Sequence, residues 1–259
     1  MIFFDTHTHF FLKEFDTDRD QVINNAISSG VTYLLVPNID SETIEPLLSL
    51  CAKYPDHCFP AVGLHPTAVK ENFQEEMNPI EKALSSLTCK AIGEIGLDLY
   101  WDQTFYRQQI IALRYQFDLA LKLNLPVILH SRESLDDLIR VVSEYKNTAL
   151  TGVFHCFPGN YDQAKKVIDL GYKIGVGGVV TFKNSNLADV IKKISLEDVL
   201  LETDSPYLAP VPYRGKRNES AYIKIVAEKI AEISGNKVED IAMITTKNAL
   251  KLFGVCPSF

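Results

Sequence analysis

Residues 1–10 read MIFFDTHTHF, an apolar run that ends in two histidines one residue apart, His7 and His9. In an extended strand alternate side chains point to the same face, so these imidazoles would project together, about 6–7 Å apart along the backbone. Neutral imidazoles at that spacing suit a metal ion, whereas the simpler alternative is a pair of polar residues at a strand end. A metal site therefore requires further ligands from elsewhere in the chain.

Short apolar runs of this kind recur along the whole sequence and are typical of buried strands. Because they are apolar throughout rather than alternating, they favour parallel strands covered on both faces. The eight runs are IFFDTH, VTYLLVPN, CFPAVGLH, KAIGEIG, PVILHS, LTGVFHC, YKIGVGG and DVLLETD.

Segments with helical spacing of apolar residues separate these runs. Asp16 and Thr17 are candidate caps of a first helix, and Thr104 is the candidate cap of the longest amphipathic segment. The C-terminal part is helical by the same test over residues 222–234 and 238–254. The sequence thus alternates strands and helices eight times.

This alternation in a chain of 259 residues predicts an α/β fold, a TIM (β/α)8 barrel, regular or distorted, with C-terminal helices. We expect one hydrolase domain over residues 1–259. The alternative is an open doubly wound sheet, but no glycine-rich nucleotide-binding motif follows any run to favour it.

Composition narrows the class of protein. The formal net charge of −7 excludes a uniformly basic surface for nucleic acid. A polyanion would therefore have to bind to a local cluster of positive residues. The five cysteines form no C-x-x-C pair, which argues against a disulfide framework or a structural zinc site. No signal-peptide or membrane-spanning pattern is visible. We expect a soluble cytoplasmic protein, and nothing indicates an obligate protein partner or a membrane.

Polar residues gather where the predicted strands end, which is where parallel barrels carry their active sites. Five of the six histidines occupy such positions. Four imidazoles and two carboxylates suit two divalent ions, and mixed nitrogen and oxygen ligands allow Zn, Mn, Mg, Co or Ni. The residues at the predicted strand ends are His7, His9, His65, Glu94, His130, His155 and Asp204.

The predicted strand order divides six of these residues into two groups. Strands one and eight become neighbours when the barrel closes, and strands five and six are neighbours already. Each residue alone has an ordinary explanation, such as a helix cap for Asp204, but six together at one barrel end favour a metal centre. The groups are His7, His9 and Asp204, then His130 and His155, with Glu94 between them as the bridge.

Seven motifs occur along nearly the whole chain in a fixed order: DTHTH, AVGLHP, AIGEIGLDLYW, LPVILHSRE, FHCFPGN, LLETDSPYLAP and PYRGKRNES. In these the sequence resembles the TatD family of metal-dependent deoxyribonucleases, within the amidohydrolase superfamily. It departs from the family pattern at Pro158, where Ser is more usual, and at Ser220, where Pro is common.

The resemblance implies a two-metal hydrolase of phosphodiester bonds, like a 3'-5' exonuclease, that acts on single-stranded DNA or duplex ends. It implies catalytic roles for Asp204, which orients or deprotonates water, and for the bridging Glu94, while His65 contacts the scissile phosphate or supports a ligand. The implied ligands are His7, His9, Glu94 and Asp204 for one ion, and Glu94, His130 and His155 for the other.

Three functions remain open on the residues themselves. Two ions about 3.5–4 Å apart can clamp a phosphodiester, but the same ligands also serve amidohydrolases that act on a small amide, lactone or ester. A non-catalytic metal-binding scaffold is the third alternative. Many amidohydrolases bridge their metals with a carboxylated lysine, and here Lys90 lies at the wrong end of the strand, about 13 Å from Glu94.

Candidate substrate contacts follow two of the strands. The loop after strand eight concentrates Arg214, Lys216 and Arg217, which we expect to bind phosphate rather than form only a solvated turn. Arg132 can present a guanidinium fork to a phosphate, or pair with Glu133 or Glu94 instead.

Tyr100 and Trp101 can stack on bases or simply pack under their loop. Glu202 shares a strand face with Asp204 and can orient a ligand. The residues fix neither the natural substrate (DNA, RNA or a modified nucleotide), nor exo- versus endo-action and polarity, nor the physiological metal, nor the oligomeric state.

Overall fold

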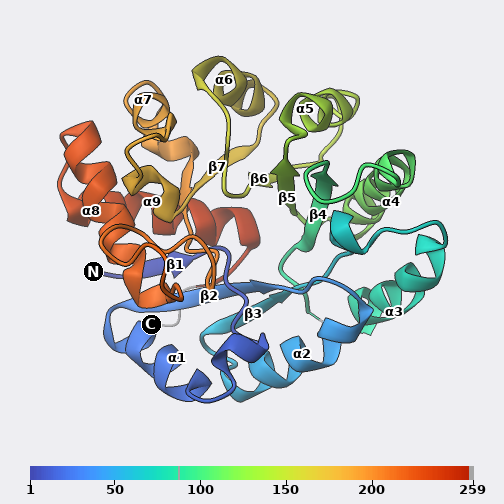
Figure 1. Ribbon diagram of the computed structural model, residues 1–259, viewed down its shortest axis with the longest axis horizontal. Coiled ribbons are helices and arrows are strands. Elements are labelled where there is room, and N and C mark those ends of the chain that lie inside the picture. Colours follow the sequence, from blue (N-terminus) through green and yellow to red (C-terminus); the bar gives the residue numbers. More distant parts are fainter. Residues whose placement is uncertain (87, 257–259) are drawn as a thin grey trace.

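The computed structural model describes residues 1–86 and 88–256 and contains eight parallel strands that alternate with helices around a central axis (Figure 1). The strands form two sheets, in the orders β1-β2-β3 and β4-β5-β6-β7-β8. Their bounds are β1 Phe3–Asp5, β2 Val31–Pro37, β3 Cys58–Ala61, β4 Ile92–Asp98, β5 Val127–Arg132, β6 Gly152–Phe154, β7 Lys173–Val176 and β8 Val199–Leu201.

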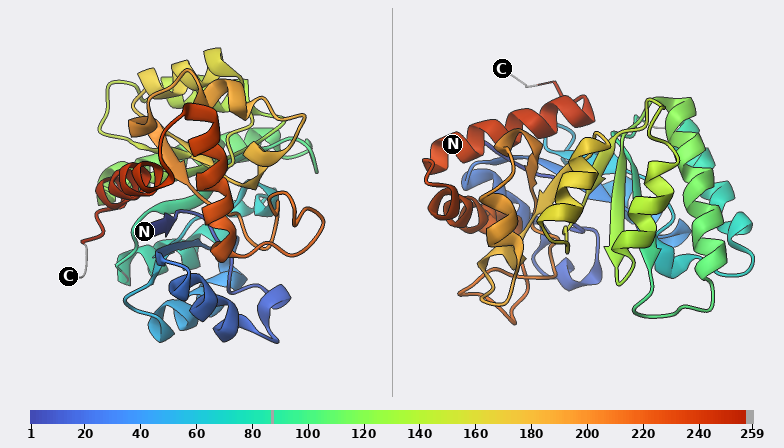
Figure 2. Two further views of the ribbon diagram at one scale, coloured as in Figure 1. Left: turned by 90° about the vertical axis from the view of Figure 1, so that its left-hand side faces the viewer. Right: turned by 90° about the horizontal axis from the view of Figure 1, so that it is seen from above.

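The α-helices lie outside the strands, and the last one crosses one end of the barrel (Figures 1 and 2). No helix in the described ranges combines the length and the apolar character that a membrane span requires. The helix bounds are α1 Arg19–Ser28, α2 Ile44–Lys53, α3 Phe73–Ser86, α4 Tyr106–Leu123, α5 Leu135–Ser143, α6 Tyr161–Asp169, α7 Leu187–Ile191, α8 Ile223–Ser234 and α9 Val238–Phe253.

Short 3-10 helices complete the connections: η1 Lys13–Phe15, η2 Ser41–Thr43, η3 Pro66–Ala68, η4 Gly178–Thr181, η5 Leu196–Asp198 and η6 Ser220–Tyr222.

Isolated bridges, rather than continuous ladders, join the two sheets at both seams within the described ranges. At one seam Thr8 pairs with Ser205, and the His9 amide donates to the Ser205 carbonyl at 2.8 Å. At the other seam Ala61 pairs with Ala91. The strands therefore follow one another around a distorted barrel, and the predicted TIM-barrel fold is confirmed.

The barrel has an inner core separate from the layer between strands and helices. Inward-facing residues of the strands pack with α9, whose side chains close the amino-terminal end of the barrel. Burial of this apolar surface is the main favourable term in the stability of the fold. The buried members of the inner core are Phe4, Tyr33, Leu35, Ala61, Ala91, Ile128, Val153, Leu200, Ala249, Phe253 and Val255.

Two predicted helix caps were wrong. The first helix begins at Arg19 after Asp18, because the chain before it forms η1 and the Arg19 guanidinium donates to the Phe10 carbonyl at 2.6 Å. Helix α4 begins at Tyr106, since the Asp102 carboxylate accepts the Thr104 amide at 2.8 Å and continues the loop past the predicted cap.

Several strands end elsewhere than predicted; β1, for example, stops at Asp5, before His7 and His9. Glu94 lies inside β4, which continues to Asp98. Strand β3 ends at Ala61, and His65 instead precedes η3 and accepts the Thr67 amide on its Nδ1. Strand β8 ends at Leu201, three residues before Asp204, which has a left-handed φ of 58°. Glu94 and His130 thus lie within regular strands, whereas the other polar residues of the barrel mouth occupy extended segments and turns beyond them.

The buried Asp5 carboxylate fastens β1 to the segment after β8. It accepts the Thr203 amide at 2.9 Å, the Thr203 hydroxyl at 2.6 Å and the Ser220 hydroxyl, and also the His7 amide at 3.2 Å. Burial raises the pKa of Asp5 to about 7, although the hydrogen bonds lower it.

We expect Asp5→Ala to lower the free energy of unfolding by about 3 kcal/mol, because buried donors lose their acceptor. Urea denaturation of metal-free protein measures this loss. Repeating it down to pH 4 reduces the offset from neutralising Asp5 on folding, because burial raises its folded-state pKa above the value in the unfolded chain. Asp56→Ala removes an exposed carboxylate as the control. Equal midpoints for the two variants would contradict the role given to Asp5.

Candidate metal centre

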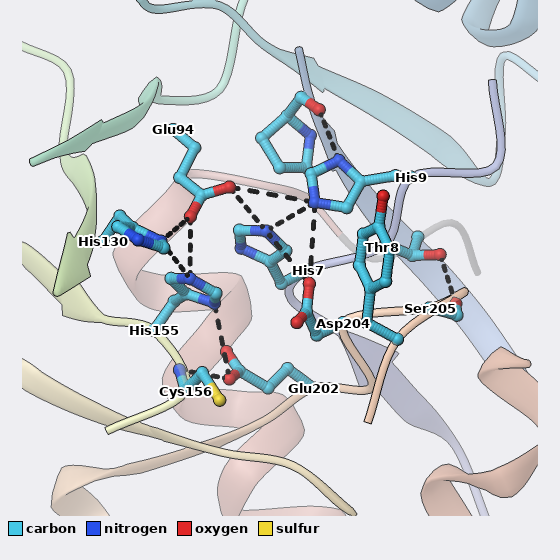
Figure 3. A network of polar contacts seen from close by, with 12 residues as sticks. His7, Thr8, His9, Glu94, His130, His155, Cys156, Glu202, Asp204 and Ser205 are labelled. Carbon is cyan, nitrogen blue, oxygen red and sulfur yellow. Dashed lines mark hydrogen bonds and ion pairs between the residues drawn. The ribbon is translucent and has the colours of Figure 1, made fainter. Parts of the chain in front are cut away.

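The seven residues predicted at the strand ends converge at one end of the barrel, around the Glu94 carboxylate. Figure 3 shows all of them except His65. The register of β4 against β5 shifts between Ile92 and Ile95, next to Glu94. Such an irregularity in a strand redirects a side chain, and here it accompanies the turn of the carboxylate into the barrel mouth. The sequence prediction gave Glu94 the right neighbours. It placed Glu94 at the end of its strand, whereas the structure places it inside β4.

One group of ligand atoms surrounds Glu94 Oε2. His7 Nε2 lies 3.0 Å from His9 Nε2 and 3.2 Å from Glu94 Oε2. Asp204 Oδ1 lies 3.8 Å from His7 Nε2 and 3.6 Å from His9 Nε2. Ligand atoms of a tetrahedral ion with bonds of about 2.0–2.2 Å are about 3.3–3.6 Å apart. These four atoms therefore have nearly the spacing of the corners of a metal site.

A second group surrounds the other oxygen, Glu94 Oε1. His130 Nδ1 and His155 Nε2 each lie 2.7 Å from it, and 3.4 Å from one another. His65 Nε2 approaches the same oxygen at 3.5 Å. The geometry thus offers His65 as a further ligand of this group, beside the two histidines that the sequence assigned to it.

In their neutral forms, His9 and His130 present lone pairs rather than protons to these groups. His9 donates from Nδ1 to the Pro37 carbonyl at 3.1 Å, which leaves Nε2 as an acceptor facing His7 and Asp204. His130 donates from Nε2 to Asp98 at 3.0 Å, which leaves Nδ1 facing Glu94. Lone pairs that converge on a carboxylate require a shared positive charge, either a proton or a cation, so these residues fit divalent metal ions.

The protonation of the metal-free site follows from crowding around Glu94. Burial raises the pKa of Glu94, but His155, His7 and His65 outweigh it and hold that pKa well below the ordinary value. Burial lowers the pKa of His155, but Glu94 and Glu202 together hold it well above the ordinary value. Burial and the charge of His155 lower the pKa of His7. Protons on His155 therefore occupy the place that a cation would take.

Three acidic residues support the ligands from behind, and sequence reasoning missed two of them. Asp98 accepts from His130, and its backbone is held by the Gln109 amide of α4. Asp5 accepts the His7 amide. Glu202, which the sequence indicated, accepts the Cys156 amide, and its Oε1 lies 3.7 Å from His155 Nδ1. Each of these acidic residues lies two or four positions from a candidate ligand in the sequence. That even spacing puts both side chains on the same face of an extended chain, and it is the signal that could have identified them.

A cavity of about 910 Å³ opens over the metal centre. Its described lining includes His9, Glu94 and Asp204 together with most of the predicted substrate residues. Tyr100 lies behind Arg132, whose guanidinium carbon is 3.9 Å from the tyrosine ring centre. The predicted substrate residues in the lining are Trp101, Arg132, Arg214 and Lys216.

Arg217 is positioned differently. Its guanidinium pairs with Asp18 at 2.7 Å and with Glu219 at 3.0 Å, and it lies over the Phe15 ring. These partners satisfy it as a brace between the loop and η1, so the structure does not bring it to the cavity with Arg214 and Lys216. Arg132 likewise stacks on aromatic rings, rather than forming the alternative pair with Glu133 or Glu94.

A family model, two sequence relatives and a solved structure all relate this chain to the same group of proteins. The TatD related DNase family model matches residues 4–254. The uncharacterized metal-dependent hydrolase YabD of Bacillus subtilis is 38% identical over 253 residues, which cover 97% of this chain and 99% of that protein. The uncharacterized metal-dependent hydrolase YjjV of Escherichia coli is 35% identical over 256 residues, 98% of each chain. The crystal structure of YjjV, a TatD homologue, aligns with a TM-score of 0.92 at 33% identity over 98% of both chains.

Fold and site together define a metal-dependent hydrolase of the TIM-barrel class. Within that class, the TatD related DNase family model matches nearly the whole sequence. The chain belongs to the TatD family, as the order of its motifs predicted.

We expect Glu94→Gln to reduce the number of bound ions per chain. Turnover should fall by about 100-fold or more, because removing even a residue that only hydrogen-bonds to a ligand costs about 10- to 100-fold. His65→Ala should retain more metal, because it removes one contact at the edge of the second group. Metal content by atomic emission, measured beside the rate, distinguishes the two variants. Unchanged metal content and turnover in Glu94→Gln would refute the bridging role.

We expect metal binding to release at least one proton per chain near neutral pH, because His155 carries a proton below its raised pKa and must lose it to bind an ion. Apparent affinity should therefore rise with pH and level off above that pKa. A pH-indicator titration with Mn²⁺ measures the release, which His155→Gln should diminish and His57→Gln should not. Binding without proton release between pH 6 and 7 would contradict this protonation scheme.

Proposed function

We propose that this hydrolase is a deoxyribonuclease that uses two divalent ions to cleave phosphodiester bonds, with single-stranded DNA or duplex ends as substrate. The observation that carries the proposal is that Arg132, Arg214 and Lys216 line the same cavity as the metal ligands. In a chain of net charge −7, such a concentration of cations at the metal centre favours a phosphate-bearing substrate.

The chain's own residues supply the base and its orientation. The Asp204 backbone is fixed by donation of its amide to the His7 carbonyl at 2.9 Å, and its side chain remains 14% exposed toward the cavity. Burial raises the pKa of Asp204, but His9, His155 and His7 lower it by more. The net pKa therefore lies below the ordinary value, and the carboxylate is ionised at neutral pH. Asp204 can therefore orient a water molecule and accept its proton.

Bound divalent ions would neutralise the phosphate charge and acidify the attacking water. His7, His9, Glu94 and Asp204 would hold one ion, and Glu94, His130 and His155 the other. Arg132, Arg214 and Lys216 would then orient the flanking phosphates by charge-assisted hydrogen bonds.

A small amide, lactone or ester remains the second candidate substrate, because Pro158, Phe182 and Leu208 give the cavity a partly apolar wall. The bridging arrangement with a carboxylated lysine has no support, since the Lys90 ammonium donates to the Gly254 carbonyl beyond α9 at 3.3 Å. Charge on the substrate is the property that separates the two candidates.

We expect metal-loaded protein to shorten end-labelled single-stranded DNA, to lose this activity in excess chelator, and to regain it with Mn²⁺ or Mg²⁺. End-labelled duplexes and a set of chromogenic amides, esters and lactones should be assayed in parallel. Turnover of a neutral compound with no cleavage of any DNA would reject the deoxyribonuclease and favour the second candidate.

The cationic lining gives this assay an internal control. Replacing Arg214 and Lys216 together with Ala should mainly raise KM for an oligonucleotide, and flatten its salt dependence by roughly one unit for each phosphate that the variant no longer binds. Replacing Arg107 and Lys247, two exposed residues of α4 and α9, removes the same charge elsewhere. If both pairs change KM equally, net charge rather than the cavity governs binding.

A further inference from the structure

Two stacks of an arginine on an aromatic ring flank the metal centre. On one wall the Arg132 guanidinium carbon lies 3.9 Å from the centre of the Tyr100 ring and 5.2 Å from that of Trp101. On the other wall the Arg214 guanidinium carbon lies 4.6 Å from the centre of the Phe182 ring. Trp101, Phe182 and both arginines line the cavity.

The stacks belong to loops on different sides of the barrel. Tyr100 and Trp101 follow β4, and Arg132 ends β5, whereas Phe182 follows η4 beyond β7 and Arg214 lies in the loop after β8. Three strand positions out of eight separate these two pairs of strands, which places them on roughly opposite sides of the mouth. A ligand that touches both stacks must cross the metal centre.

Trp101 is exposed in a way that packing does not explain. The residue is 69% exposed and Tyr100 is 49% exposed, although both have large aromatic side chains. Their rings meet edge to face at 5.0 Å, so the tyrosine limits the orientation of the indole. An indole held at a cavity rim with most of its surface free is suited to stack on a planar ligand group.

One carboxylate ties this wall to the metal ligands. Asp98 Oδ1 accepts the Tyr100 amide at 3.0 Å and the Trp101 amide at 3.2 Å, while Oδ2 accepts from His130 at 3.0 Å. The position of the indole is therefore fixed relative to the second group of ligands. On the opposite wall, the Thr181 hydroxyl accepts the Val211 amide at 2.9 Å and holds the loop of Arg214 against η4.

We propose that the two stacks are nucleotide subsites, so that the enzyme acts on a phosphodiester with a base on each side rather than on a simple phosphate ester. This proposal rests on the deoxyribonuclease function above. Trp101 stacks on one base and Phe182 on the other. A guanidinium whose face lies on an aromatic ring keeps its edge donors for phosphate, so Arg132 and Arg214 bind the phosphates next to these bases.

The kinetic test uses four dinucleotides: one with both bases, two with an abasic residue on one side, and one with both sides abasic. Trp101→Ala should lower kcat/KM for the complete dinucleotide by roughly 5- to 150-fold, the range for removal of one base stack. The effect should disappear for one of the singly abasic substrates. Phe182→Ala should behave in the same way toward the other one.

Tyr115→Ala, which removes an exposed ring on α4, is the matched control and should leave all four rates unchanged. The proposal is overturned if Trp101→Ala affects all four dinucleotides by the same factor, or if Trp101→Ala and Phe182→Ala lose their effects on the same abasic substrate.

A second measurement does not depend on hydrolysis. Trp101 is the only tryptophan of the chain, so its fluorescence reports on this subsite alone. Dinucleotides whose bridging oxygen is replaced by a methylene group should quench the emission of the metal-loaded protein, and the analogue abasic on the Trp101 side should not. Quenching without cleavage of any DNA would reject the deoxyribonuclease but keep the base subsite, whereas cleavage of DNA without quenching would reject the subsite.

Discussion

The Glu94 carboxylate is the group on which the rest of the site depends. Imidazoles approach both of its oxygens, and His155 and His130 lie only 2.7 Å from one of them. A buried carboxylate in the middle of a barrel would be expensive without positive charge, so these histidines serve either as protonated partners or as ligands that share a cation with it. The same contacts therefore stabilise the metal-free barrel and prepare it for metal.

Residues one layer further out determine how precisely this arrangement is kept. Asp98 fixes the proton of His130 on Nε2, and the Pro37 carbonyl does the same for His9 on Nδ1. Asp98 also holds the backbone of Tyr100 and Trp101, so a single side chain positions both a metal ligand and the cavity rim. Because the interior is close-packed, a displacement of His130 is transmitted through Asp98 to the backbone of Tyr100 and Trp101, and the reverse also holds.

The fold and the convergence of the candidate ligands were predictable from sequence because both follow from periodicity. Eight apolar runs set the barrel, and its topology then brought His7 near Asp204 without any local signal. What the sequence did not reveal depends on tertiary contacts. Nothing near Arg217 in the chain indicates its pairing with Asp18 of a distant segment, and the irregularity that places Glu94 inside β4 arises from register against β5. Asp98 could have been found, since four residues along a strand return to the same face.

The excess of negative charge bears on how a nucleic acid would reach this site. With a net charge of −7, the chain lacks the overall positive charge by which a basic DNA-binding protein holds a long duplex. Cationic side chains do gather at the mouth of the barrel, where Arg132, Arg214 and Lys216 line the same cavity as the candidate metal ligands. A strand would therefore enter by a short segment or an end, where few phosphates face the rest of the surface. The proposed phosphodiester substrate is therefore supported by where the positive charges lie in the fold, rather than by the total charge of the chain.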